Sequence, residues 1–413
     1  MEMKIAVIGA GVSGLTVANL LKNKYEVKVF ERESVPGGLV RCEQTEGGLF
    51  HICGGHVFNT KKQEVLDWFW TRFEREKDFL KADRNSVVFM KDGLKVPYPI
   101  ENHTYLFDEA VQKSVIQDWL DIFRDKKNEA GNFADFLRQR FGNTLYELYF
   151  RPYNNKVWRR DLSEIPLSWL EGKLPMPTVE EMIYNNMNHI EERSFVHSSF
   201  WYEKEGGSQF LADRLAEGVD VVYGTVIDKV ARRGEQWEVA GEMFDRVVFC
   251  GNVKQLPELI EGVDVSQYNN AIEKLEYHGT TTAFCYIDNN PYSWIYLPSD
   301  AHESHRIICT GNFSPRNNAT KRLTASIEFT DHRTESEIKD NLARIPLHPE
   351  YITHHYNQYT YPIQDGGTRL MISDLKTSLA SHGFLMTGRF ADWEYYNMDA
   401  AMYAAMQMVG KFF

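Results

Sequence analysis

The sequence predicts an α/β protein with a nucleotide-binding sheet near its N-terminus, and three observations lead to this prediction. The apolar residues 5–8 are followed directly by the glycine pattern G-x-G-x-x-G at residues 9–14. A helix-like apolar pattern comes next, and a second apolar run, VKVF, is then followed by Glu31. Strand, glycine turn, helix, strand and acid in this order are typical of a Rossmann-like βαβ unit.

Each part of this first unit has an expected role. Gly9 allows the tight turn, Gly11 lets the backbone approach a pyrophosphate, and Gly14 lets the helix pack on the strand. The N-terminus of the helix that follows then presents free N–H groups and the positive end of its dipole to the phosphates. Glu31 is placed to accept hydrogen bonds from ribose hydroxyls.

The composition limits the classes to which the chain can belong. With 413 residues, 43% of them hydrophobic, it can form a large core and two or three domains. Its net charge of -12 disfavours a nucleic-acid partner. The five cysteines include no Cys-x-x-Cys pair, which disfavours a disulfide framework or a metal site and is typical of a reducing compartment.

The sequence also shows no pattern typical of a targeting signal or a membrane span. The start of the chain lacks the basic-then-apolar pattern of a signal peptide. No apolar run approaches the roughly 20 residues that cross a bilayer. We therefore expect a cytoplasmic protein without a membrane partner.

The stretch GGLFHICGGHVFNT, residues 47–60, combines glycine pairs with a histidine and aromatic residues. Gly54 and Gly55 carry no side chain, so the backbone there can lie against a flat ring. His56 follows directly. Taken alone, a turn with a core histidine is the stronger interpretation of this stretch.

Motifs in order along the chain change this balance, because they resemble those of the UDP-galactopyranose mutase family. The motifs are most similar to those of the eukaryotic type. That family lies within the FAD-dependent amine-oxidase-like superfamily. The matching segments are RESVPGGLVR (32–41), GGHV (54–57), KVPYPIENH (95–103), NFADFLRQRFGNTLYELYFRPYNNKVW (132–158), WLEGK (169–173), EKEGGSQFLADRLAEG (203–218), SWIYLPSDAHESHRIICTGNFSP (293–315), TYPI (360–363) and GRFADWEYYNMD (388–399).

The resemblance implies an FAD-binding Rossmann-like domain of the GR2 type. FAD would act in its reduced form, and NAD(P)H is left open as the reductant. The cofactor contacts that the resemblance assigns are Gly9, Gly11, Val12, Ser13, Gly14, Glu31, Arg32, Gly38, Leu39, Gly54, Gly55, His56, Val226, Gly388, Arg389, Tyr396, Asn397 and Met398.

The same resemblance implies a nucleotide-diphosphate sugar as substrate. The implied reaction interconverts UDP-galactopyranose and UDP-galactofuranose, through attack of N5 of reduced FAD on the anomeric carbon, in cell-surface polysaccharide biosynthesis. Catalytic roles fall on His56, Lys173 and Arg306. The implied substrate contacts are Tyr98, Glu101, Asn154, Trp158, Trp294, Tyr296, Tyr361 and Tyr395.

Two other functions stay open. An FAD-dependent oxidoreductase of the amine oxidase or protoporphyrinogen oxidase class would need an apolar substrate tunnel and hydride transfer. A flavoprotein without activity would serve as a binding partner.

Three residues depart from the family pattern. Lys173 stands where the family has an Arg, Phe313 where it has a Tyr, and Glu101 where it has a Gln. An ionised Glu accepts hydrogen bonds and donates none, so it suits the adjacent N–H groups of guanine better than uracil. The base and the sugar are therefore left open.

We expect three parts in the fold. Residues 1–60, 205–255 and 380–413 would assemble the Rossmann-like domain, with a β-meander leading into the strand VVFCGN. Residues 61–200 would form a mostly helical insertion, and residues 256–379 a β-sheet substrate domain. A homo-oligomer is left open.

Overall fold

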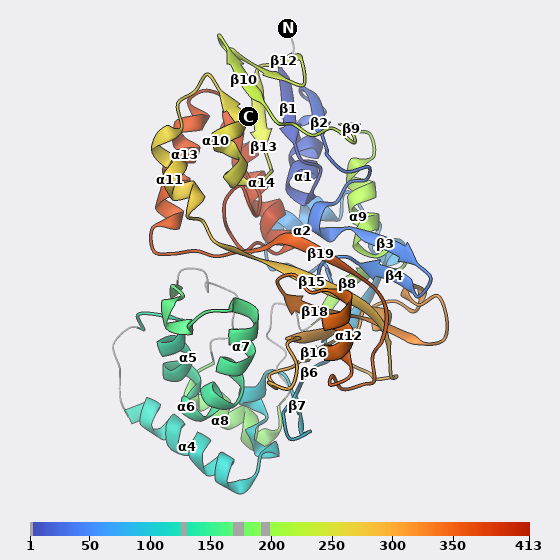
Figure 1. The fold of residues 1–413 in the computed structure, drawn as a ribbon, viewed down its shortest axis with the longest axis vertical. Coiled ribbons are helices and arrows are strands. Elements are labelled where there is room, and N and C mark those ends of the chain that lie inside the picture. The colour runs from blue at the N-terminus through green and yellow to red at the C-terminus, as the bar shows by residue number, and fades with distance from the viewer. Residues whose placement is uncertain (1–2, 125–129, 168–176, 191–198) are drawn as a thin grey trace.

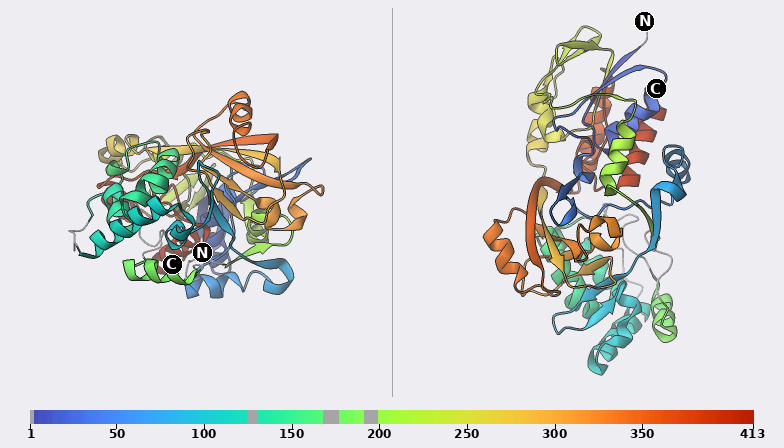
Figure 2. Two further views of the ribbon diagram at one scale, coloured as in Figure 1. Left: turned by 90° about the horizontal axis from the view of Figure 1, so that it is seen from below. Right: turned by 90° about the vertical axis from the view of Figure 1, so that its right-hand side faces the viewer.

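The computed structural model of the protein describes residues 3–124, 130–167, 177–190 and 199–413. The described elements form an elongated molecule with an α/β part at one end (Figure 1). Helices α4 to α8 gather at the other end. The long strands β15 and β19 cross the middle, between these two ends (Figures 1 and 2).

The α/β part is built on a five-stranded sheet in which all neighbouring strands are parallel. The order along the sheet is β20-β13-β1-β2-β9, so its strands come from distant segments of the chain. This confirms the expected Rossmann-like fold. The strands are β1 (Lys4–Ile8), β2 (Glu26–Phe30), β9 (Asp220–Val222), β13 (Arg246–Phe249) and β20 (Phe384–Met386).

Helices cover both faces of this sheet, as its nearly continuous apolar strands require. On one face lie α1 (Val12–Leu21), α9 (Gly207–Ala216) and α14 (Met398–Phe412). On the other lie α10 (Leu256–Leu259), α11 (Ser266–Glu273) and α13 (Thr368–Ala380).

Gly14 has the packing role that the sequence predicts. A Cβ atom at this position would overlap the carbonyl oxygen of Gly9 and lie 3.3 Å from the side chain of Val7 on β1. Helix α1 can therefore approach β1 this closely only with glycine at position 14.

A small sheet extends the α/β part. Its order is β12-β11-β10-β14, and β10, β11 and β12 form the expected antiparallel meander. The four strands are β10 (Val230–Arg233), β11 (Gln236–Val239), β12 (Glu242–Phe244) and β14 (Ile260–Glu261).

A seven-stranded sheet lies in the other half of the molecule, and its order is β19-β15-β18-β17-β16-β6-β7. All its pairs are antiparallel except β16 with β6. The strands are β6 (Ser86–Phe89), β7 (Lys95–Pro97), β15 (Tyr277–Ile287), β16 (Trp294–Tyr296), β17 (Arg306–Ile308), β18 (Leu323–Thr330) and β19 (Glu350–Pro362).

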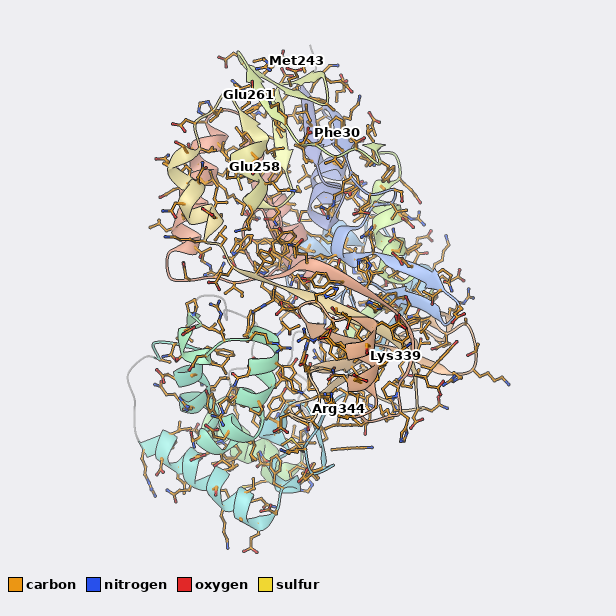
Figure 3. The ribbon with its side chains drawn as sticks, in the orientation of Figure 1. Phe30, Met243, Glu258, Glu261, Lys339 and Arg344 are labelled. Carbon is orange, nitrogen blue, oxygen red and sulfur yellow. The ribbon has the colours of Figure 1, made fainter. Side chains whose placement is uncertain are left out.

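The side chains of strand β18 alternate between the two faces of this sheet, which differ in character. Its residues 323, 325, 327 and 329 are apolar and pack in one core with α12 (Glu335–Leu342). Thr324, Ser326, Glu328 and Thr330 alternate with them and are also buried, so they face the opposite side. Lys339 and Arg344 mark the α12 side, well below the α/β part that holds Phe30, Met243, Glu258 and Glu261 (Figure 3).

The helical part packs around an aromatic-rich core. Its helices are α4 (Glu109–Arg124), α5 (Phe133–Phe141), α6 (Asn143–Leu145), a π-helical turn (Tyr146–Phe150), α7 (Arg151–Trp158) and α8 (Val179–Asn188). Shorter connecting elements are β3 (Cys42–Thr45), β4 (Gly48–His51), α2 (Gln63–Phe69), α3 (Arg75–Asp78), β5 (Phe79–Asp83) and β8 (Ser199–Glu203). In the described ranges no helix is long and apolar enough to cross a membrane.

Two segments depart from the expected boundaries of the three parts. Segment 61–200 is not only helical, because β6 and β7 extend the seven-stranded sheet through β16. Segment 256–379 is not only a β-sheet domain, because α10, α11 and α13 cover the parallel sheet. The reason is packing: the apolar faces of α11 and α13 are buried against β13 and β20.

Candidate cofactor and substrate site

A cleft of about 900 Å³ runs between the carboxyl ends of β1 and β2 and the seven-stranded sheet. Its size lies toward the upper end of the roughly 300–1,000 Å³ of ligand pockets. Most residues assigned to the cofactor line it: Gly9, Gly11, Val12, Ser13, Gly14, Glu31, Arg32, Gly38, Leu39, Gly54, Gly55, His56, Val226, Arg389, Tyr396, Asn397 and Met398.

Gly388 has a different place. It does not line the cleft but packs behind it, where a Cβ atom would lie 3.2 Å from Oγ of Ser13. Its φ of +124° and its N–H, which donates to Asp392 at 3.0 Å, fix the turn that precedes α14.

Helix α1 opens onto the cleft with its N-terminus. Gly11 is its N-cap, and no side chain caps the first N–H groups of the helix. Gly38, from the second glycine pair, lies against Gly11, since a Cβ atom at Gly38 would be 3.4 Å from the Cα of Gly11. Two glycine turns and one helix N-terminus thus provide bare N–H groups of the kind that bind a pyrophosphate.

Glu31 is fixed at the nucleotide end of the cleft. Its carboxylate accepts hydrogen bonds from the main-chain N–H of Ala10 at 2.6 Å and of Glu33 at 3.0 Å. Val226, 71% exposed, and Arg32 form the outer wall beside it. This arrangement leaves room for a ribose and a base at the rim.

Residues 54–56 form the wall farther along the cleft. A Cβ atom at Gly55 would overlap the Cγ2 atom of Ile308, so no side chain fits there. Nε2 of His56 is buried and has no hydrogen-bond partner among the residues that the structure describes. Burial, and then the charge of Arg389, lower the pKa of His56 to about 4, so the ring is neutral near pH 7.

Helix α14 brings a second N-terminus to the same cleft. Asn397 is its N-cap and makes no side-chain capping bond, and Asn397 and Met398 both line the cleft. A negative charge at this point of the cleft would be stabilised by the helix dipole and the free N–H groups.

Arg306 and the buried Glu328 form an ion pair on the floor of the cleft, and the Arg306 side chain is 22% exposed. Nε of Arg306 donates to Glu328, and its Nη2 donates to Oη of Tyr361 at 3.3 Å. Burial would raise the pKa of Glu328, but the charge of Arg306 lowers it to about 2. Glu328 therefore stays ionised and holds the guanidinium in place.

Three aromatic side chains and an arginine stack beside this pair. Tyr361 and Tyr395 lie parallel with ring centroids 5.2 Å apart, and Trp158 meets Tyr361 edge-on at 6.0 Å. The guanidinium of Arg389 lies 4.2 Å from the ring centre of Tyr395, within the range of a cation–π contact.

A second cationic and aromatic group lies beside Arg306, because Tyr296 on β16 pairs with Arg306 on β17. Arg84 donates to Oη of Tyr296 and lies 4.9 Å from the ring of Trp294. Tyr98 packs on Tyr296 with centroids 4.9 Å apart. Arg84 lines the cleft. Arg306, Arg389 and Arg84 thus bring three cations to one end of it.

The predicted substrate residues and the predicted catalytic Arg306 take three kinds of position. Trp294, Tyr296, Arg306 and Tyr395 line the cleft. Tyr98, Trp158 and Tyr361 support those residues from behind, as the ring contacts show. Asn154 donates to the carbonyl of Phe150 within its own helical segment at 2.7 Å.

The structure places two of the three residues that depart from the family pattern. Glu101 is 1% exposed, and its main-chain carbonyl accepts from Asn186, so the structure does not bring it to the cleft wall. Phe313 is buried against Trp294, with ring centroids 4.9 Å apart. Lys173 and the motif WLEGK lie outside the described residues.

Sequence reasoning missed Glu328 and Arg84. The signal for Glu328 was present, since T-x-S-x-E-x-T places polar residues at every second position of an otherwise apolar strand. Arg84 carries no such signal, because its neighbours in the cleft come from β16, far along the chain. Among the described residues, no group of His, Cys, Asp and Glu could hold a metal ion.

Comparisons with known proteins agree with this geometry. A family model described as an NAD(P)-binding Rossmann-like domain matches residues 7–73. The dTDP-fucopyranose mutase of Escherichia coli is 26% identical over 42% of this chain and 46% of its own length. The UDP-galactopyranose mutase of Mycoplasma pneumoniae is 27% identical over 43% of this chain and 46% of its own length. The chain thus spans about half the length of these curated relatives.

A solved structure extends the likeness to the whole chain. The crystal structure of a reduced UDP-galactopyranose mutase matches with a TM-score of 0.88 and 20% identity, covering 100% of this chain and 94% of that one. The resemblance to the mutases is confirmed. At this identity the structural match with the mutase shows the fold alone. A coproporphyrinogen III oxidase of Staphylococcus aureus is also similar, 21% identical over 73% of this chain and 68% of its own length.

Proposed function

We propose that the protein is a flavin-dependent nucleotide-sugar mutase. One observation carries this proposal: Arg306, Arg389 and Arg84, with Tyr296 and Tyr395, meet at the end of a dinucleotide cleft. Cations and phenol hydroxyls suit a diphosphate group. UDP-galactopyranose and UDP-galactofuranose are the default substrates, from the resemblance to the mutases.

The chain fits FAD along the length of the cleft. The N-terminus of α1 would hold the pyrophosphate, Glu31 the ribose, and the backbone near Val226 the adenine. Gly55 lets residues 54–56 pack closely against Ile308, so their backbone can form a wall for a flat ring. The partnerless Nε2 of His56 offers that ring a hydrogen-bonding atom.

Bound FAD in its reduced form would supply a nucleophilic ring nitrogen for the anomeric carbon. The chain supplies the rest. The N–H groups that begin α14 would stabilise negative charge on the reduced ring. Arg306, held by Glu328, would stabilise the diphosphate oxygen as its bond to the sugar breaks and it takes the electron pair.

The main alternative is an FAD-dependent oxidoreductase of the amine oxidase or porphyrinogen oxidase class. The coproporphyrinogen III oxidase similarity favours it. It requires an apolar tunnel next to the ring. Three guanidinium groups at that end of the cleft favour a phosphate-bearing substrate instead. NAD(P)H as reductant, a cytoplasmic location and a homo-oligomer remain predictions.

The test is turnover of UDP-galactofuranose by the purified protein, with and without dithionite, followed by chromatography. We expect UDP-galactopyranose only in the reduced sample. Arg306→Ala should lower turnover on the order of a hundredfold, as for loss of a group that stabilises developing negative charge. Arg316→Ala, which removes an exposed arginine paired with Glu205, is the matched control and should keep activity.

Reduction of the flavin by an amine or a porphyrinogen, without dithionite and without sugar turnover, would favour the oxidoreductase. If the protein carries reducible FAD but converts no UDP-sugar, GDP- and dTDP-sugars are the next substrates to compare.

A further inference from the structure

His278 on β15 faces a hydrogen-bond acceptor with each of its ring nitrogens. Nε2 lies 2.7 Å from the main-chain oxygen of Trp158, the last residue of α7. Nδ1 lies 3.0 Å from Oδ1 of Asp331, which follows β18. A neutral imidazole carries one N–H and could make only one of these bonds. Both bonds together require the doubly protonated ring.

The surroundings of His278 supply one hydrogen-bond acceptor on each side of the ring. Asp331 supplies a carboxylate. Burial would raise its pKa, but the hydrogen bond to His278 and the nearby charge of Arg159 lower it. The carbonyl of Trp158 belongs to the C-terminus of a helix, where unpaired carbonyls and the helix dipole attract cations. The side chain of His278 is 16% exposed, so water screens the pair only in part.

The other charged groups on the neighbouring elements pair with one another. Glu276, on the approach to β15, pairs with Arg160. Arg159 and Arg333, which follow α7 and β18, both pair with Glu303. On β19, the residue opposite His278 is Tyr361. Asp331 is thus the charged side chain that contacts the ring in the part of the chain that the structure describes.

The end of α7 that His278 contacts is also held by β18 and by the loop between β16 and β17. Thr330 donates to the carbonyl of Lys156 at 2.6 Å. Nζ of Lys156 in turn donates to the carbonyls of Leu297 and Ser304, at 2.8 and 2.9 Å. Helix α7 is therefore attached to the strands that carry Tyr296 and Arg306.

Trp158 connects the end of α7 to the side chains of the cleft. The ring of Trp158 packs edge-on against Tyr361, and Tyr361 accepts a hydrogen bond from Arg306. A shift of the Trp158 main chain would move the support behind both side chains.

We propose that His278 is a positioning residue, whose doubly protonated ring clamps Trp158 against Tyr361 and so sets the position of Arg306. Loss of one proton from His278 releases one of the two bonds and loosens the substrate end of the cleft. The link to substrate rests on the proposed function, because the substrate contacts of Trp158 and Arg306 are part of it.

The decisive variant is Asp331→Asn. Residue 331 has a φ of +64°, a left-handed conformation that Asn adopts as readily as Asp. The Asn amide can donate to Nδ1 of a neutral ring while Nε2–H still donates to Trp158. In this variant both ring nitrogens of His278 can keep their hydrogen bonds while the ring is neutral. Asp288→Asn is the matched control, because it alters a similar pair, with the exposed His348, outside the cleft.

The first readout does not depend on activity. Nitrogen NMR of the histidine-labelled full chain, with His278 assigned through His278→Gln, reports which ring nitrogens carry protons. We expect two protonated nitrogens in the wild type and one, Nε2, in Asp331→Asn at the same mildly acidic pH. A neutral ring in the wild type under these conditions would overturn the proposal whatever the enzyme does.

The second readout is positioning. Hydrogen exchange of the last turn of α7, corrected for intrinsic rates, should show protection that falls in the wild type as His278 loses its proton. Protection should stay constant in Asp331→Asn. In the active enzyme the KM for the nucleotide sugar should rise roughly tenfold over the same pH range, about the effect of one hydrogen bond to a charged group, with little change in kcat.

These readouts separate the two proposals. Charged His278 with pH-dependent protection of α7, in a protein that converts no nucleotide sugar, would support the clamp and contradict the proposed function. A charged ring without any pH-dependent change in α7 protection or in KM would overturn the clamp in an active mutase.

Discussion

Arg306 and Glu328 lie directly opposite each other on the adjacent antiparallel strands β17 and β18. Nε of Arg306 donates to the Glu328 carboxylate, which is 1% exposed. The guanidinium still lines the cleft, and it donates to Tyr361 behind the cleft wall. A buried carboxylate thus holds a cation at the wall where the phosphates would bind.

We expect Glu328→Gln to weaken this arrangement without removing the arginine. The amide is nearly the same size but carries no charge, so Arg306 loses its partner and its fixed direction. The Arg306 side chain is 22% exposed, so water partly solvates its charge and the loss of unfolding free energy should be about 1–3 kcal/mol, below that for a fully buried pair. The value of kcat/KM should fall at least tenfold, measured with UDP-galactofuranose after dithionite reduction.

A suitable control for this variant is Glu205→Gln, which removes an exposed carboxylate from its pair with Arg316. Exposed pairs contribute about 0–1 kcal/mol, so this variant should keep both stability and activity. Equal losses in both variants would contradict the role of Glu328.

Gly55→Ala tests the space for a flat ring. The added methyl group would overlap Ile308 and lie 3.1 Å from the ring of Phe313, so residues 54–56 would be pushed into the cleft. We expect the purified variant to retain much less FAD, measured by flavin absorbance per protein. Gly366→Ala is the control, because a Cβ atom at Gly366 would meet nothing within 4 Å. Full FAD content in Gly55→Ala would contradict this placement of the ring.

The nucleotide end of the cleft could be predicted from sequence because its parts are local. The first strand, glycine turn and helix are adjacent in the chain, and Gly9, Gly11 and Gly14 have fixed roles in that turn. The prediction for Gly14 needed only the packing of α1 on β1.

The substrate end could not be predicted in the same way. Arg84 and Tyr296 are brought together because β6 pairs with β16, and no local pattern encodes that pairing. Glu101 shows a second limit: its motif matches the mutases, but the structure buries the side chain in the core. A resemblance in sequence identifies a residue but does not show where its side chain points.

His56 offers a prediction about pH. Burial and the charge of Arg389 lower its pKa to about 4, so the ring stays neutral between pH 5 and pH 9. Any change of KM near neutral pH should therefore persist in His56→Asn, even if kcat falls. The measurement is a pH profile of both variants, His56→Asn and Asp331→Asn. Loss of the KM change in His56→Asn alone would assign the titration to His56 and contradict this prediction.

Glu203, at the end of β8, makes the most direct stability prediction. Both of its carboxyl oxygens are buried and have no hydrogen-bond partner among the described residues. Burial raises its pKa to about 8, from an ordinary value of 4.5. The folded protein then holds a proton that the unfolded chain releases, so stability falls as the pH rises from about 4.5 to about 8.

Glu203→Gln should remove this pH dependence, because the amide stays neutral. At pH 5 the variant should match the wild type closely, and at pH 8 it should be more stable by roughly 3–5 kcal/mol. Denaturant unfolding at both pH values, with FAD content held equal, measures the difference. Glu205→Gln, two residues along the chain and exposed, should show no such gain. A wild type that is as stable as Glu203→Gln at pH 8 would mean that Glu203 finds a partner for its charge.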